Sequence, residues 1–199
     1  MYEPSEECIV DFWTQGKLKN LPVSSSNPNF IKAISQLRES CVDQSACVKQ
    51  MKEDYVRLFS KQNLSLAPAF KSHYIKSSDS NKTIPSVTEF YNSYGWESRF
   101  RNRISDGHIS IKLLFLTLLV DKYLDLDDAV CIIEMRGEIR RFINNHILSW
   151  IMEWNDKIQQ NAKTICYKGI GSLILASVED IFNYLEQNVS LKQNEGIKN

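Results

Sequence analysis

Histidine, clustered aspartate and paired glycine are the residue types of this chain that could carry chemistry. The three histidines are His73, His108 and His146. His146 falls on an apolar helical stripe. His73 stands in a predicted loop and has no carboxylate beside it. The acidic run Asp125-Leu126-Asp127-Asp128 lacks the glycine and distal glutamate of an EF-hand, so Asp125 and Asp127 are interpreted as turn and N-cap residues. Gly169-Ile170-Gly171 has two glycines of a dinucleotide loop, and we interpret it as a place of close helix packing. No catalytic residue, metal ligand or cofactor is therefore expected, and the protein is predicted not to be an enzyme.

The cysteines are scattered along the chain and form no Cys-x-x-Cys pair. They are Cys8, Cys41, Cys47, Cys131 and Cys166. Free thiols in a reducing compartment are therefore expected rather than a metal site or a disulfide.

The charge pattern argues against nucleic acid as a partner. The 199 residues contain 24 acidic and 24 basic side chains, and the densest basic run, residues 99–103, is short. The acidic N-terminus does not resemble a secretory signal. The longest apolar stretch, residues 109–120, is interrupted by Ser110, Lys112 and Thr117 and is too short for a membrane span. We therefore expect a cytoplasmic protein without stable membrane insertion.

Apolar spacings of three and four predict an all-α protein. Such stripes run through residues 30–41, 48–59, 139–158 and 170–185. Residues 108–124 are apolar around the whole helix axis, which predicts a central buried helix. Two stretches, residues 21–29 and about 60–85, are predicted loops. The expected architecture is a single domain over residues 1–199, built as a multi-helix bundle.

Three blocks of the sequence resemble the TorD/DmsD (NarJ-like) family of redox-enzyme maturation chaperones. The first is Tyr55-Val56-Arg57-Leu58-Phe59 followed by Ala67-Pro68-Ala69-Phe70-Lys71-Ser72-His73-Tyr74. The second is Phe90-Tyr91-Asn92-Ser93-Tyr94-Gly95-Trp96 followed by Asp106-Gly107-His108-Ile109. The third is Phe142-Ile143-Asn144-Asn145-His146-Ile147-Leu148-Ser149-Trp150. The blocks follow the family's order and lie in a best-matching region of residues 45–187.

The chain differs from the family pattern around His108. Gly107 stands where the family has an aspartate, Ser105 where it has a proline, and Lys112 where it has a glutamate. These differences leave the implied TorD-like fold in place and concern the way in which a leader peptide would be bound.

The resemblance implies a chaperone without catalysis or cofactor. Its partner would be a molybdopterin oxidoreductase catalytic subunit or the twin-arginine signal peptide of that subunit, bound until the cofactor is inserted and before export. A monomer and a homodimer are both compatible with the family. A helical ligand-binding regulator, or another interaction module without a molybdoenzyme client, is the alternative.

A leader peptide offers an apolar, helix-prone segment behind two arginines, so its receptor needs an apolar groove with acceptors nearby. The predicted peptide-binding residues are Tyr55, Leu58, Phe59, Pro68, Phe70, Ser72, Tyr74, Trp96, Asp106 and His108. Asp54, Glu97 and Asp106 are the candidates for meeting the arginines. Two alternatives remain open: Leu58 and Phe59 end a helical stripe that could be core, and His108 could serve only as a helix-cap residue.

Overall fold

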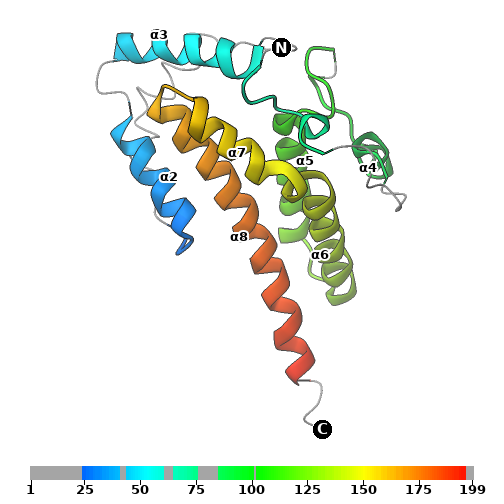
Figure 1. Ribbon diagram of the computed structural model, residues 1–199. Helices are drawn as coiled ribbons and strands as arrows, with labels where there is room; N and C mark the ends of the chain where they lie inside the picture. The colour runs from blue at the N-terminus through cyan, green and yellow to red at the C-terminus, as the bar shows by residue number, and fades with distance from the viewer. Residues whose placement is uncertain (1–23, 41–43, 61–64, 76–84, 101, 196–199) are drawn as a thin grey trace. The chain divides into compact units, whose positions relative to one another are not determined.

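The computed structural model describes residues 24–40, 44–60, 65–75, 85–100 and 102–195. Their α-helices are α2 (Pro28–Glu39), α3 (Gln44–Tyr55), α4 (Val87–Ser93), α5 (Ile109–Leu124), α6 (Ala129–Ile143), α7 (Ser149–Asn161) and α8 (Ile165–Glu195) (Figure 1). Two π-helical turns, η1 (Val56–Ser60) and η4 (Asn144–Leu148), and one 3-10 turn, η2 (Lys71–His73), complete the helical structure. These residues form no β-strand, only an isolated antiparallel bridge between Phe70 and His108. The predicted all-α fold is confirmed.

The chain divides into two compact units, and each unit is built from two stretches of sequence. Unit 1 comprises Met1–Ala69 and Ile151–Ser177, and unit 2 comprises Phe70–Trp150 and Val178–Asn199. Both boundaries in the C-terminal half fall inside helices, so α7 and α8 each contribute to both units. The expectation of one domain over residues 1–199 stays a prediction.

In unit 1, α8 packs closely against two other helices at its glycines. A Cβ atom at Gly169 would lie 2.7 Å from Leu37 Cγ on α2, and one at Gly171 would lie 2.7 Å from Asn155 Oδ1 on α7. Near this crossing, Gln159 Nε2 donates to the Asn155 side chain and to the Lys168 carbonyl oxygen. The interpretation of the two glycines as residues of close helix packing is confirmed.

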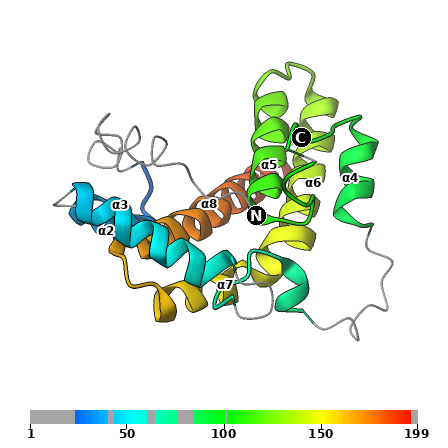
Figure 2. The ribbon, with the colours of Figure 1, turned by 90° about the horizontal axis from the view of Figure 1, so that it is seen from above.

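In unit 2, α5 and α6 lie side by side and hold an aromatic core (Figure 2). Phe115 on α5 and Phe142 on α6 are fully buried, with ring centroids 5.1 Å apart. Phe90 from α4 completes the cluster, with its centroid 5.2 Å from that of Phe142. Each such ring contributes about 1.5–3 kcal/mol by leaving water. Helix α5 covers the segment predicted to be a central buried helix, but only one side of it is buried: the other side is exposed, with Leu114 at 38% and Leu124 at 71%.

Local capping and one glycine place Trp96 beside this core. Helix α4 begins with a capping box, in which Glu89 N donates to Ser86 Oγ at 3.1 Å and Ser86 N donates to Glu89 Oε2 at 2.6 Å. After the helix, Gly95 adopts φ 60°, a left-handed conformation that favours glycine. The chain thereby turns back, and Trp96 N donates to the Tyr91 carbonyl oxygen at 3.0 Å.

Two expectations from the sequence need correction. The N-cap residue of α6 is Asp128, whose Oδ1 accepts from Val130 N at 3.0 Å and from Cys131 N at 2.9 Å, so the cap lies one residue beyond Asp127. Cys47 is disulfide-bonded, contrary to the expected free thiol, whereas Cys131 and Cys166 are free.

No helix in the described part of the chain combines the length and the apolar character needed to cross a membrane.

Candidate functional site

The segment from Asp106 to His108 joins two features of unit 2: a contact between His108 and Phe70, and a pocket lined by Asp106. On one side, His108 pairs with Phe70 through the isolated bridge, and their rings meet edge to face at 5.2 Å between centroids. His108 is also the N-cap of α5, because its Nδ1 accepts from Ser110 N at 3.2 Å. The helix-cap interpretation of His108 is therefore confirmed, whereas its peptide-binding role stays a prediction. Gly107 adds no bulk here; a Cβ atom would meet Phe70 only at an ordinary 3.8 Å.

On the other side, Asp106 faces a small acidic and aromatic pocket. Its volume is about 150 Å³, and its lining residues are Thr88, Tyr91, Asn92, Trp96, Glu97, Ser98 and Asp106. Among the described residues, the lining contains two carboxylates and no basic side chain. Tyr91 Oη donates to the Asp106 carbonyl oxygen at 3.2 Å, and the Trp96 and Tyr91 rings lie 4.9 Å apart. Burial, followed by the negative charge of Asp106, raises the pKa of the Tyr91 phenol, which stays neutral as a donor.

Two lysines of unit 2 are anchored on the π-turn η4. Lys71 Nζ donates to the Asn145 carbonyl oxygen at 2.7 Å, and Lys112 Nζ donates to the His146 carbonyl oxygen at 3.1 Å. A π-turn departs from the regular hydrogen-bonding of the α-helix, and such turns are frequent at functional sites. The Trp150 indole also donates to the His146 carbonyl oxygen, at 2.8 Å, and the Tyr74 ring stacks on Trp150 at 5.4 Å.

The groups around this turn carry shifted pKa values. Burial, then the charge of Lys71, lowers the pKa of Lys112 from 10.5 to about 8. Burial also lowers the pKa of Lys71. The pKa of His146 falls from 6.5 to about 4 through burial and then through the charges of Lys112 and Lys71. His146, which falls on the predicted apolar stripe, is 5% exposed, and its Nε2 has no hydrogen-bond partner among the described residues.

His108 is neutral near pH 7 for a similar reason. Burial, followed by the charge of Lys112, lowers its pKa from 6.5 to about 4. A neutral imidazole is required for its Nδ1 to accept the hydrogen bond from Ser110 N.

The predicted residues of unit 1 lie in its core or at the edge of that core. Leu58 is fully buried and Phe59 is 8% exposed, which agrees with the core alternative for both. The Phe59 ring contacts Tyr55 and Tyr167, each at 5.6 Å between centroids. The π-turn η1 presents the Leu58 carbonyl oxygen to Ala67 N at 3.0 Å, just before the half-buried Pro68.

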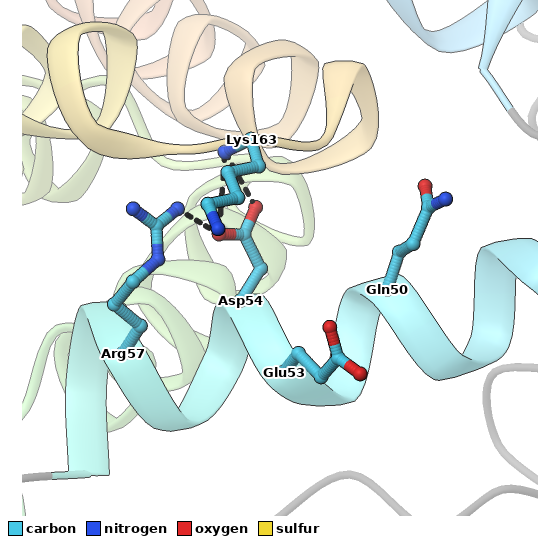
Figure 3. A pocket seen from close by; sticks show the side chains of 5 residues that line it. All are labelled: Gln50, Glu53, Asp54, Arg57 and Lys163. Carbon is cyan, nitrogen blue, oxygen red and sulfur yellow. Dashed lines mark hydrogen bonds and ion pairs between the residues drawn. The ribbon is translucent and has the colours of Figure 1, made fainter.

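Asp54, one candidate for meeting arginines, already has its partners within unit 1 (Figure 3). It is 1% exposed, and its carboxylate forms an ion pair with Arg57. It also accepts from Lys163 N at 2.9 Å, and from Thr164 N and Thr164 Oγ1 at 2.8 Å each. Burial raises the pKa of this carboxyl, whereas its hydrogen bonds lower the pKa by a larger amount. The pKa of Asp54 is therefore below its ordinary value of 3.8. Asp54 therefore holds the start of α8 and is not available to a ligand.

The ten predicted peptide-binding residues thus divide between the units. Tyr55, Leu58, Phe59 and Pro68 belong to unit 1, and Phe70, Ser72, Tyr74, Trp96, Asp106 and His108 belong to unit 2. Within unit 2, Phe70 meets His108, Asp106 and Trp96 share a pocket, Tyr74 stacks on Trp150, and Ser72 is exposed. Sequence reasoning missed the anchored pair Lys71 and Lys112; the lysine in place of a family glutamate at position 112 was the available signal.

A family model described as nitrate reductase delta subunit matches residues 25–156, more than half of the chain. The chain belongs to this family. The family consists of molybdoenzyme assembly chaperones and shares a clan of redox-enzyme maturation chaperones with TorD and DmsD. The resemblance found in the sequence is confirmed at the level of that clan, and a general, non-catalytic chaperone role follows from family membership. No curated protein and no solved structure matches the chain.

Proposed function

We propose that this delta-subunit family member is a cytoplasmic chaperone that binds the catalytic subunit of a molybdopterin oxidoreductase, or its twin-arginine leader. It keeps the subunit competent for cofactor insertion and assembly before export. It acts by binding alone and uses neither a cofactor nor a metal of its own. Family membership supports the class of client. The acidic and aromatic pocket of unit 2 supports recognition of a basic segment.

That pocket carries the proposal because its chemistry suits a guanidinium group. A planar guanidinium bonds to carboxylates through paired N–H groups and stacks on aromatic faces. Glu97 and Asp106 supply the carboxylates, and Trp96 supplies the ring. A volume of about 150 Å³ accommodates the head of a single arginine side chain. One arginine of a leader would enter this pocket, and the second would remain at its rim.

The apolar part of the leader would contact Phe70 and Tyr74. Phe70 contacts His108, two residues along the chain from Asp106 of the pocket, so a single peptide could reach both features of unit 2. The exposed Ser72 lies between the two aromatic residues and offers a hydroxyl group to the peptide backbone.

Calorimetric titration with a synthetic twin-arginine leader of a molybdoenzyme tests this proposal. Changing both Glu97→Gln and Asp106→Asn should weaken binding by tenfold or more, roughly the effect of losing one charge-assisted hydrogen bond. A leader with both arginines replaced by lysine should also bind less tightly, because an ammonium lacks the planar fork. Glu134→Gln, an exposed carboxylate of α6 outside the pocket, serves as the matched control.

The same titration with a mature subunit that lacks its leader separates the two forms of the client. Binding of the subunit alone would place recognition in the folded or partly folded enzyme. Absence of binding by both the leader and the subunit, together with no molybdoenzyme subunit in a pull-down from native cytoplasm, would refute the proposed function.

A further inference from the structure

A second, larger pocket lies in unit 1 and has no role in the proposed client site. Its volume is about 400 Å³, and its lining residues are Gln50, Glu53, Asp54, Arg57 and Lys163. The first four follow one another at spacings of three, one and three along α3 and η1, and therefore share one helix face. Lys163 comes from the turn that precedes α8 (Figure 3).

Asp54 organises this pocket without being open to a ligand. Its buried carboxylate binds the Arg57 guanidinium and the backbone N–H groups of Lys163 and Thr164. Because one carboxylate holds both segments, the two cationic residues are fixed beside each other (Figure 3). A pre-oriented guanidinium loses less rotamer entropy when it forms further hydrogen bonds.

Arg57, Lys163 and Gln50 retain N–H donors that can bind the oxygens of a ligand. The Arg57 side chain is 32% exposed, and its contact with Asp54 is made by one of its two terminal nitrogens. Lys163 binds Asp54 through its backbone, so its ammonium group is not used in that contact. Gln50 adds an amide donor, and the Glu53 carboxylate points away from Asp54 (Figure 3). The lining carries two basic and two acidic side chains and hence no net charge; the buried Asp54 is paired with Arg57, and Glu53 is the exposed carboxylate.

We propose that this pocket binds an oxyanion, the phosphate or carboxylate group of a polar small molecule. Arg57 and Lys163 would hold its oxygens, Gln50 would donate one further hydrogen bond, and Glu53 would limit the affinity by repulsion. A volume of about 400 Å³ lies within the usual range of small-ligand sites, about 300–1,000 Å³, and the polar lining suits a hydrophilic ligand. The inference does not depend on the proposed client, which is bound by unit 2.

The test is an NMR titration of the full chain with inorganic phosphate and, separately, with acetate. Saturable shifts of the Lys163 and Thr164 backbone amides and of the Arg57 side-chain N–H groups are expected, since these groups surround Asp54. Lys163→Gln should weaken binding roughly tenfold, and Glu53→Gln should strengthen it severalfold. Neither substitution removes a hydrogen bond of Asp54, because Lys163 contributes its backbone.

Lys49→Gln removes an exposed lysine of α3 outside the pocket and is the matched control. Binding of phosphate alone identifies a phosphate ligand, and binding of acetate as well identifies a carboxylate ligand; both support the proposal. Non-saturable shifts, or an equal effect of Lys49→Gln and Lys163→Gln, would overturn it. Loss of leader binding with intact phosphate binding would refute the proposed function and leave this inference standing.

Discussion

Replacement of Lys112 by methionine is expected to stabilise the protein. Lys112 is 2% exposed; its Nζ donates to the His146 carbonyl oxygen and lies 4.9 Å from the centroid of the Trp150 ring. Among the described residues, no carboxylate forms an ion pair with this ammonium group. A buried charge without an opposite charge is costly, and one carbonyl oxygen and one ring compensate for it only in part.

The size of the effect follows from the pKa. A decrease from 10.5 to about 8 corresponds to about 3 kcal/mol against the charged form in the folded state. Methionine keeps an unbranched stem of similar length but loses the hydrogen bond to His146, whose carbonyl oxygen still accepts from Trp150 Nε1. We therefore expect a net gain of about 2 kcal/mol at pH 7, which raises Tm by roughly 4–8 °C in a chain of this length.

The pH dependence supplies a second, independent signature. Below pH 8 the Lys112 ammonium is charged in the folded and in the unfolded protein, so its burial destabilises the folded protein by the full amount. Between pH 8 and 10.5 the folded protein releases this proton before the unfolded chain does, and stability rises with pH. Lys112→Met should lack this rise, so the stability advantage of the variant should shrink as the pH approaches 10.

Urea denaturation of both proteins at several pH values between 7 and 10 measures these differences. Lys122→Met removes an exposed lysine of the same helix and controls for the loss of a positive charge. If Lys112→Met destabilises the protein at pH 7, or if its advantage is independent of pH, the account of a buried, uncompensated ammonium is wrong.

Three further predictions concern Asp54, His146 and two glycines. Asp54→Asn should lower the free energy of unfolding by about 3 kcal/mol in urea denaturation, because it leaves the donors at the start of α8 without a carboxylate; a change below 1 kcal/mol would contradict this role. Stability should fall as the pH drops from 6.5 to about 4, since the unfolded chain protonates His146 before the folded protein does. His146→Phe should reduce that fall, and an unchanged slope would exclude His146 as its source. Gly169→Ala should cost about 1–3 kcal/mol by clashing with Leu37, whereas Gly137→Ala, with no atom within 4 Å of its Cβ, should gain about 0.5–1 kcal/mol; equal Tm shifts would refute the contrast.

Much of the helical structure was predictable because it depends on local periodicity. The stripe through residues 139–158 spans η4 and parts of α6 and α7, and the apolar run at 108–124 is α5. The interruption between α6 and α7 by a π-turn was not predictable, since one extra residue in a turn leaves the apolar spacing nearly unchanged.

The candidate site was predictable only as a set of residue types. The motif around Asp106 and His108 drew attention to the right segment, and Trp96 lies in the pocket beside Asp106. The sequence offered Asp54 and Asp106 as equal candidates for binding arginine. The fold distinguishes the two candidates. The Asp54 carboxylate is surrounded by donors of Lys163 and Thr164, which lie 109 and 110 positions further along the chain. Asp106 instead lines a pocket.

The sequence by itself determined the all-α class, the clan of redox-enzyme maturation chaperones and the two glycines of close packing, because these depend on periodicity, ordered motifs and the absence of a side chain. Tertiary structure decided the electrostatics. The sequence places Lys112 in an apolar helix, but only the packing of α5 against η4 shows that its ammonium is buried, where burial and Lys71 lower its pKa to about 8. A pKa shift, a pocket and a buried ion pair all depend on atoms brought together from distant parts of the chain, and local sequence carries little information about those distances.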